Sequence, residues 1–268
     1  MVFEQFIKLR WIEKRPNYAF LIGFFYSLLG LISARLIFPN NIGVMSVAFT
    51  SILIIPSLNQ LLAAEENVEI REKKFSFVQL FRDHRDILEI YIFLFFGIFT
   101  TYLYFAFIFP ESVSLLFFAP QLNVAGVTGA ATSVSQEIFF WKILKNNLLV
   151  LLVSFVLSLV YGAGSILFIN WNASVWGTVF GFMSRQSIQA NNIFYGFTNI
   201  IMPSFPHMFT EALSYFFAAI VGGILSKAII RERLFSKKFN HVLTDAVLVM
   251  CLAAVLIVVA AVIETSII

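Results

Sequence analysis

Long apolar runs separated by short polar segments dominate the chain. A bilayer crossing takes about 20 mainly apolar residues, so a run of that length predicts a transmembrane helix. The apolar and polar positions do not alternate in short stretches as they do in a transmembrane β-barrel. Six runs are long enough for a full span: 18–38, 42–63, 87–109, 144–169, 206–230 and 246–263.

One further stretch, 170–205, is not apolar enough for an ordinary span. Its two apolar pieces, 175–183 and 193–202, are separated by polar residues, and neither piece crosses a bilayer alone. Non-helical backbone at membrane depth is tolerated only where protein or a water-filled cavity surrounds it, and discontinuous helices mark the binding sites of many transporters. We therefore predict an all-α, polytopic transmembrane helical bundle with about six full spans plus one broken or re-entrant helical segment.

Basic residues indicate how the chain lies in the membrane. Thirteen of the 18 Lys and Arg residues fall in the N-terminal tail, in 64–86 and in 231–243. The positive-inside rule assigns these segments to the cytoplasm. This predicts a multi-pass protein of the cytoplasmic (cell) membrane with a cytoplasmic N-terminus.

The same assignment predicts a hidden crossing. Between residues 87 and 230 the chain leaves the cytoplasm and returns to it, which needs an even number of crossings, yet only three complete apolar runs lie there. The broken segment 170–205 is the preferred position. The alternative is a crossing within 115–140, which Lys142 and Lys145 favour because they otherwise lie on the non-cytoplasmic side.

The whole chain, 1–268, is predicted to be a single membrane domain. It comprises an N-terminal helical hairpin (17–63), a cytoplasmic loop of mixed charge (64–86), a core (87–230) and a C-terminal helix (244–264). Hydrophobic residues make up 60% and charged residues 12%, which excludes a water-soluble globule. The net charge of +3 is too small to indicate nucleic-acid binding, so the lipid bilayer is the expected partner.

Two pairs of polar residues stand out within the apolar runs. His207 and Glu211 are four residues apart and therefore share one helix face. An ionisable pair in a membrane helix is a functional candidate, as a proton relay, half of a metal site or a structural ion pair. Asn146 and Asn147 enter the fourth run together, and at least one side-chain amide needs a partner inside the bundle.

No motif for catalysis, a cofactor or a metal accompanies these residues. A zinc protease needs His-Glu-x-x-His and a third ligand, whereas the motif here holds one His. We therefore expect no enzymatic activity, no cofactor and no metal. Further residues are assigned a structural role, as small residues that let helices approach closely or as the proline that opens a helix: Gly162, Gly164, Pro206, Gly222 and Gly223.

The order of these motifs resembles the stage II sporulation protein M family, in particular its archaeal branch, over about residues 17–230. The resemblance is most specific at Asn146-Asn147 and at Pro206-His207-x-x-x-Glu211. Further shared motifs are Phe95-Phe96-Gly97, Phe109-Pro110-Glu111 and Phe117-Phe118-Ala119-Pro120-Gln121. The resemblance implies a polytopic protein of the cytoplasmic membrane with no established enzymatic activity.

Two functions follow as hypotheses. The first is a non-enzymatic scaffold or assembly component that associates with protein partners or with itself in the membrane. The second is a transporter, flippase or channel-like subunit, in which the broken segment, the two asparagines and the His/Glu pair line a polar path. They differ in whether His207 and Glu211 face a hydrated cavity or a closed helix contact.

Overall fold

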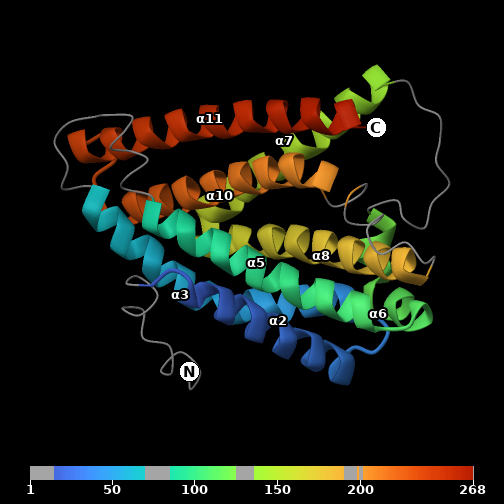
Figure 1. Ribbon diagram of the computed structural model, residues 1–268. Coiled ribbons are helices and arrows are strands. Elements are labelled where there is room, and N and C mark those ends of the chain that lie inside the picture. Colours follow the sequence, from blue (N-terminus) through green and yellow to red (C-terminus); the bar gives the residue numbers. More distant parts are fainter. Residues whose placement is uncertain (1–14, 70–84, 125–135, 190–197, 199–201, 268) are drawn as a thin grey trace.

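A computed structural model describes residues 15–69, 85–124, 136–189, 198 and 202–267 of this protein. These residues form eight α-helices and one short 3-10 helix, with no strand among them. The elements are shown in Figure 1: α2 (Tyr18–Ile37), α3 (Ile42–Glu69), α5 (Arg85–Ile108), α6 (Glu111–Val124), α7 (Gln136–Tyr161), η2 (Ala163–Ser165), α8 (Ile166–Gln189), α10 (Met202–Arg231) and α11 (Lys237–Ile267).

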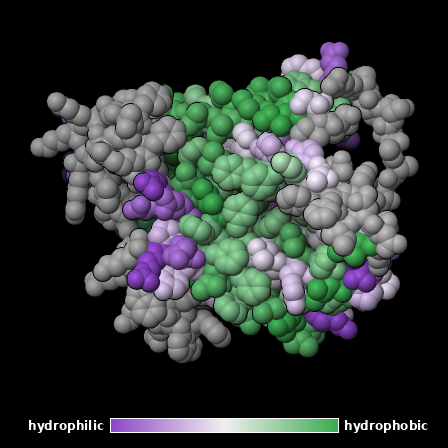
Figure 2. Space-filling model, viewed as in Figure 1, coloured by the Kyte–Doolittle hydropathy of each residue, from purple (hydrophilic) through white to green (hydrophobic). Residues whose placement is uncertain are grey.

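Seven helical segments of the described chain are long and apolar enough to cross a membrane. They are α2, α3, α5, α7, η2 with α8, α10 and α11. Figure 2 shows apolar residues across the middle of the visible face and hydrophilic residues toward its ends, as expected for a belt in contact with lipid tails. The protein is therefore a multi-pass membrane protein, and the predicted all-α helical bundle is confirmed.

Helix α10 forms the centre of the bundle. It packs against α11, α7 and α3, while α5 packs against α2 and α8 (Figure 1). Every residue from 214 to 226 of α10 is buried. A helix that is apolar on all sides is buried on all sides when neighbours are available, which explains why this segment carries no polar stripe.

The predicted fourth crossing, 144–169, is wrong in its position. Helix α7 ends at Tyr161, and a second span runs from Ala163 to Ile188. The chain turns at Gly162, which has φ of 69° and ψ of −101°. Residues other than glycine rarely adopt a positive φ. The helix therefore ends at this glycine, although the apolar run continues through it.

The hidden crossing lies at 163–188 and not across 170–205. Four spans now lie between residues 87 and 230, namely α5, α7, η2 with α8, and α10, so the even number required by the charge pattern is met. Residues 170–189 belong to one continuous helix. Within the alternative stretch 115–140, the described helix α6 ends at Val124 and is only 14 residues long, too short to span.

Several predicted boundaries shift by a few residues. Helix α3 continues through Glu69, into the segment assigned to a cytoplasmic loop, and most of that loop lies outside the described residues. Helix α10 begins at Met202, ahead of Pro206. The C-terminal helix extends from Lys237 to Ile267, beyond the predicted 244–264.

Candidate functional site

The side chains of Asn147 and Glu211 meet between two transmembrane helices. The Nδ2 amide of Asn147, on α7, donates a hydrogen bond to Oε1 of Glu211, on α10. Both residues are buried, with 6% of each exposed. Asn146, which is exposed, donates from Nδ2 to Oδ1 of Asn147 over 3.2 Å. The structure thus links three of the four candidate residues in one hydrogen-bonded chain.

His207 lies one turn before Glu211 on α10. It is 8% exposed, and its ring lies against the indole of Trp176 from α8, with ring centroids 5.3 Å apart and planes at 50°. Nδ1 of His207 has no hydrogen-bond partner in the described part of the chain. No ion pair joins His207 to Glu211 among those residues, so the two share a helix face without bonding to each other.

The space beside Glu211 is small. A cavity there offers about 10 Å³ to the centre of a water molecule, which is about the room that one water needs. Its lining is mostly apolar and aromatic: Phe95, Asn172, Trp176, Met208, Glu211, Ala212 and Tyr215. Among the described residues, Asn147 and Glu211 therefore bond directly to each other, and the adjoining space has room for about one water.

A second carboxyl group lies near the contact. Glu264, on α11, is within electrostatic range of both Glu211 and Tyr215. The sequence pattern did not single out Glu264, because it lies at the end of the predicted helix 244–264, directly after the apolar run 246–263. Helix α11 continues to Ile267 and carries Glu264 alongside the bundle. An acidic residue directly after an apolar run was the available signal.

The two glycines of α10 lie at close helix contacts. A Cβ atom at Gly222 would lie 2.7 Å from the carbonyl oxygen of Phe155 and 2.8 Å from Cβ of Ser158, both on α7. At Gly223 it would meet the side chain of Leu62 on α3. Helices that touch through glycine bring their backbones close together, which favours direct packing in lipid.

The other residues assigned a structural role lie at helix ends. Gly162 forms the turn between α7 and α8, and Ala163 donates its backbone N–H to Oδ1 of Asn59 over 2.9 Å. Gly164 lies against the carbonyl oxygen of Leu157, 2.9 Å from where its Cβ would be. Pro206 lies in the second turn of α10, so it does not begin the helix, which starts at Met202.

A second set of buried polar side chains was not singled out by the sequence. Gln121, on α6, donates from Nε2 to the carbonyl oxygen of Gly43 over 3.0 Å. Asn170, on α8, donates from Nδ2 to the carbonyl oxygen of Val47 (2.9 Å) and to Oγ of Ser51 (3.1 Å). Both residues are fully buried. Since they bond to α3, they tie three helices together, and only the tertiary structure reveals those acceptors.

Within the described residues, no three His, Cys, Asp or Glu side chains are arranged so that they could hold a metal ion.

Comparison with known proteins places the chain in a family. The model of the family described as Stage II sporulation protein M matches residues 90–267, which is more than half of the chain. The match includes the four candidate polar residues and the C-terminal helix, and it begins after the N-terminal hairpin that the motif resemblance had included. No curated protein and no solved structure matches the chain. The chain therefore belongs to the stage II sporulation protein M family.

Proposed function

We propose that this protein is a non-enzymatic scaffold or assembly component of a membrane complex. The observation that carries the proposal is the direct contact between Asn147 and Glu211, in which two buried polar side chains at membrane depth bond to each other. A satisfied buried polar contact favours one helix register and a single arrangement of the bundle. A fixed bundle suits a protein that offers a constant surface to partners.

Helix α7 is the proposed partner surface. Only 28% of the residues in its most apolar stretch are buried, the smallest share among the seven spans. The helix packs mainly against α10 and α11. Four of its exposed apolar side chains recur at helical spacing and so form one stripe. They are Leu149, Leu152, Val156 and Val160. The side of α7 that faces away from α10 and α11 is therefore free for a neighbouring protein or a second copy of this chain.

Site-specific photo-crosslinking in native membranes tests this proposal. A photoreactive amino acid at Leu152 is expected to give a discrete protein adduct of reproducible mass. The matched control carries the same group at Val255 of α11, which is similarly exposed, at 58% against 57% for Leu152. Adducts with lipid alone at both positions would contradict a partner surface on α7.

We propose that the protein lies in the cytoplasmic membrane with its N-terminus in the cytoplasm. This orientation is supported by the position of Arg85, Arg231 and Lys237, which lie at the start of α5, the end of α10 and the start of α11. These helix ends share one end of the bundle (Figure 1). The positive-inside rule assigns that end to the cytoplasm.

A transporter or channel-like subunit is the second candidate. One observation favours it: Glu211 and Glu264 are within electrostatic range of each other, and neither pairs with a basic side chain in the described chain. Carboxyl groups inside a membrane bundle are typical of proton relays. In this alternative, the small cavity beside Glu211 is part of a path that opens in another conformation.

Proton flux into liposomes separates the two functions. Purified protein is reconstituted with a pH-sensitive dye inside, and a potassium diffusion potential drives proton entry. If the protein is a scaffold, the proton flux is expected to equal that of empty liposomes. A transporter predicts flux that Glu211→Gln abolishes and that Glu111→Gln, at an exposed position, leaves unchanged.

A further inference from the structure

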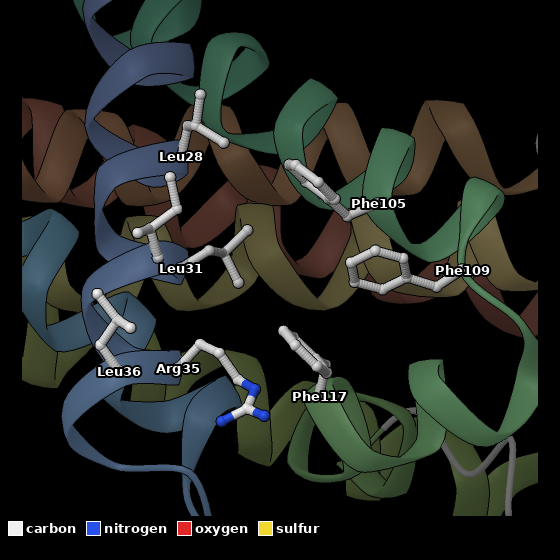
Figure 3. Close-up of a pocket in the computed structure, with 8 residues that line it drawn as sticks. Leu28, Leu31, Arg35, Leu36, Phe105, Phe109 and Phe117 are labelled. Atoms are coloured by element: carbon white, nitrogen blue, oxygen red, sulfur yellow. The ribbon is translucent and has the colours of Figure 1, made fainter.

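A lipid-facing groove lies between α2, α5 and α6 (Figure 3). It has a volume of about 200 Å³. Apolar side chains of α2 form one wall, and Phe105 of α5, Phe109 directly after α5 and Phe117 of α6 form the other. The complete lining is Leu28, Leu31, Ile32, Arg35, Leu36, Phe105, Phe109 and Phe117. Seven of these eight residues are apolar, which suits a hydrocarbon chain.

Arg35 is the one charged residue of this lining. In Figure 3 its guanidinium group extends from α2 toward the α6 side of the groove. Arg35 is exposed, and within the described chain it makes neither an ion pair nor a side-chain hydrogen bond. An arginine presents five N–H donors in a planar fork that matches a phosphate group.

The position of Arg35 along α2 matches the layers of a bilayer. It lies in the last turn of the helix, which ends at Ile37, and therefore near the membrane surface. Leu28 lies seven residues earlier, about 10 Å deeper at 1.5 Å per residue. The groove thus has the charge of Arg35 at its headgroup end, and its α2 wall continues to the depth of the acyl chains.

We propose that this groove binds one anionic phospholipid, with the phosphate on Arg35 and an acyl chain between α2 and the three phenylalanines. The charge at one end and the apolar walls along the rest distinguish it from the general lipid-facing surface. The site lies outside the Asn147–Glu211 contact, so it does not depend on the function proposed above.

Native mass spectrometry of the purified full chain tests the proposal, with equimolar phosphatidylglycerol and phosphatidylcholine as probes. The wild type is expected to retain phosphatidylglycerol preferentially. Arg35→Gln is expected to weaken that binding roughly threefold to tenfold, the range for one charged hydrogen bond at a partly exposed site. Lys142→Gln is the control, since Lys142 is an exposed base near the start of α7 that does not line the groove.

A second pair of variants tests the apolar part of the site. Ile32→Trp fills the groove, whereas Leu29→Trp places the same side chain on α2 outside it. Only Ile32→Trp is expected to reduce lipid retention. A photoreactive acyl chain on phosphatidylglycerol is expected to label peptides of α2, α5 and α6 above all others.

Arg35 also lies at the C-terminal end of α2, where a positive charge stabilises a helix. That role alone would make Arg35→Gln less heat-stable in either lipid without changing the ratio in which the two lipids are retained. An unchanged ratio, or acyl-chain labelling spread evenly over the lipid-facing helices, would overturn the proposal.

Discussion

Asn147 on α7 and Glu211 on α10 form a hydrogen bond 64 residues apart in sequence, and the close contact between Ser158 and Gly222 has the same separation. The two helices run parallel, so both contacts belong to one register. The polar bond and the glycine contact therefore support the same packing of α7 on α10. A change at either point is expected to disturb the other.

Removing the donor at this contact is expected to destabilise the bundle. Asn147→Leu leaves the buried carboxyl group of Glu211 without its partner, which costs about 1–3 kcal/mol. Thermal unfolding in detergent micelles measures the loss. Asn146→Ala is the matched control, since Asn146 is exposed, and it is expected to stay near the wild type.

A double-mutant cycle separates the hydrogen bond from the cost of an unpaired carboxyl group. Asn147→Leu with Glu211→Leu removes both partners, so the double variant is expected to be more stable than Asn147→Leu alone. Hydrogen bonds between membrane helices average about 0.6 kcal/mol, so most of the loss in the single variant comes from the orphaned Glu211. Strictly additive losses would show that the two side chains do not interact.

Two adjacent glycines of α10 are expected to differ in their tolerance of alanine. Gly222→Ala pushes against the carbonyl oxygen of Phe155, which is backbone and cannot move aside, at a cost of about 1–3 kcal/mol. Gly223→Ala meets only the end of the Leu62 side chain, which can rotate away. Both gain about 1 kcal/mol of helix propensity, so Gly223→Ala is expected to be near neutral. Equal melting temperatures for the two variants would contradict this packing.

The turn between α7 and α8 is expected to require glycine. Gly162→Ala forces a side chain into a backbone conformation with φ of 69°, which costs about 1–3 kcal/mol. The same thermal measurement checks it. Asn59→Ala removes the acceptor of the Ala163 N–H and is expected to destabilise the same turn by about 1 kcal/mol. If Gly162→Ala were as stable as Gly223→Ala, a continuous helix through residue 162 would be favoured.

Accessibility labelling checks the orientation. In a Cys251→Ala background, Ser236→Cys in the turn between α10 and α11 is expected to react with a membrane-impermeant maleimide only after the cytoplasmic side is opened. Asn40→Cys, in the turn between α2 and α3, is expected to react in intact cells. The reverse pattern would overturn a cytoplasmic N-terminus.

The break in the helices lies at Gly162 and not within 170–205 for a physical reason. Hydropathy measures only how apolar a window is, and the segment around Gly162 is apolar whether it is helical or turned. The polar residues within 170–205 suggested a break, yet Asn170 is accommodated inside a continuous helix because α3 supplies its acceptors. An amide in a membrane helix indicates a break only when no neighbouring helix can bond to it.

The candidate polar residues were found one at a time and could not be paired from sequence. The apolar runs around them made Asn147 and Glu211 unusual, because polar groups are costly in hydrocarbon. Their separation of 64 residues does not show whether they are in contact. The contact depends on α7 and α10 becoming neighbours, with α8 between them in the chain. Glu264 was missed since its relevance depends on how far α11 extends and on which neighbours it meets.

The sequence by itself determined the all-α membrane class, indicated an even number of crossings between residues 87 and 230, and identified the residues that interrupt the apolar pattern. These follow from the length of apolar runs and from the distribution of charge, which are properties of single segments. Only the tertiary structure decided where the hidden crossing begins, that Asn147 bonds to Glu211, and that Arg35 lines a groove with Phe117. Those features depend on which helices become neighbours, because in lipid the partners of a polar side chain come from other helices and not from water.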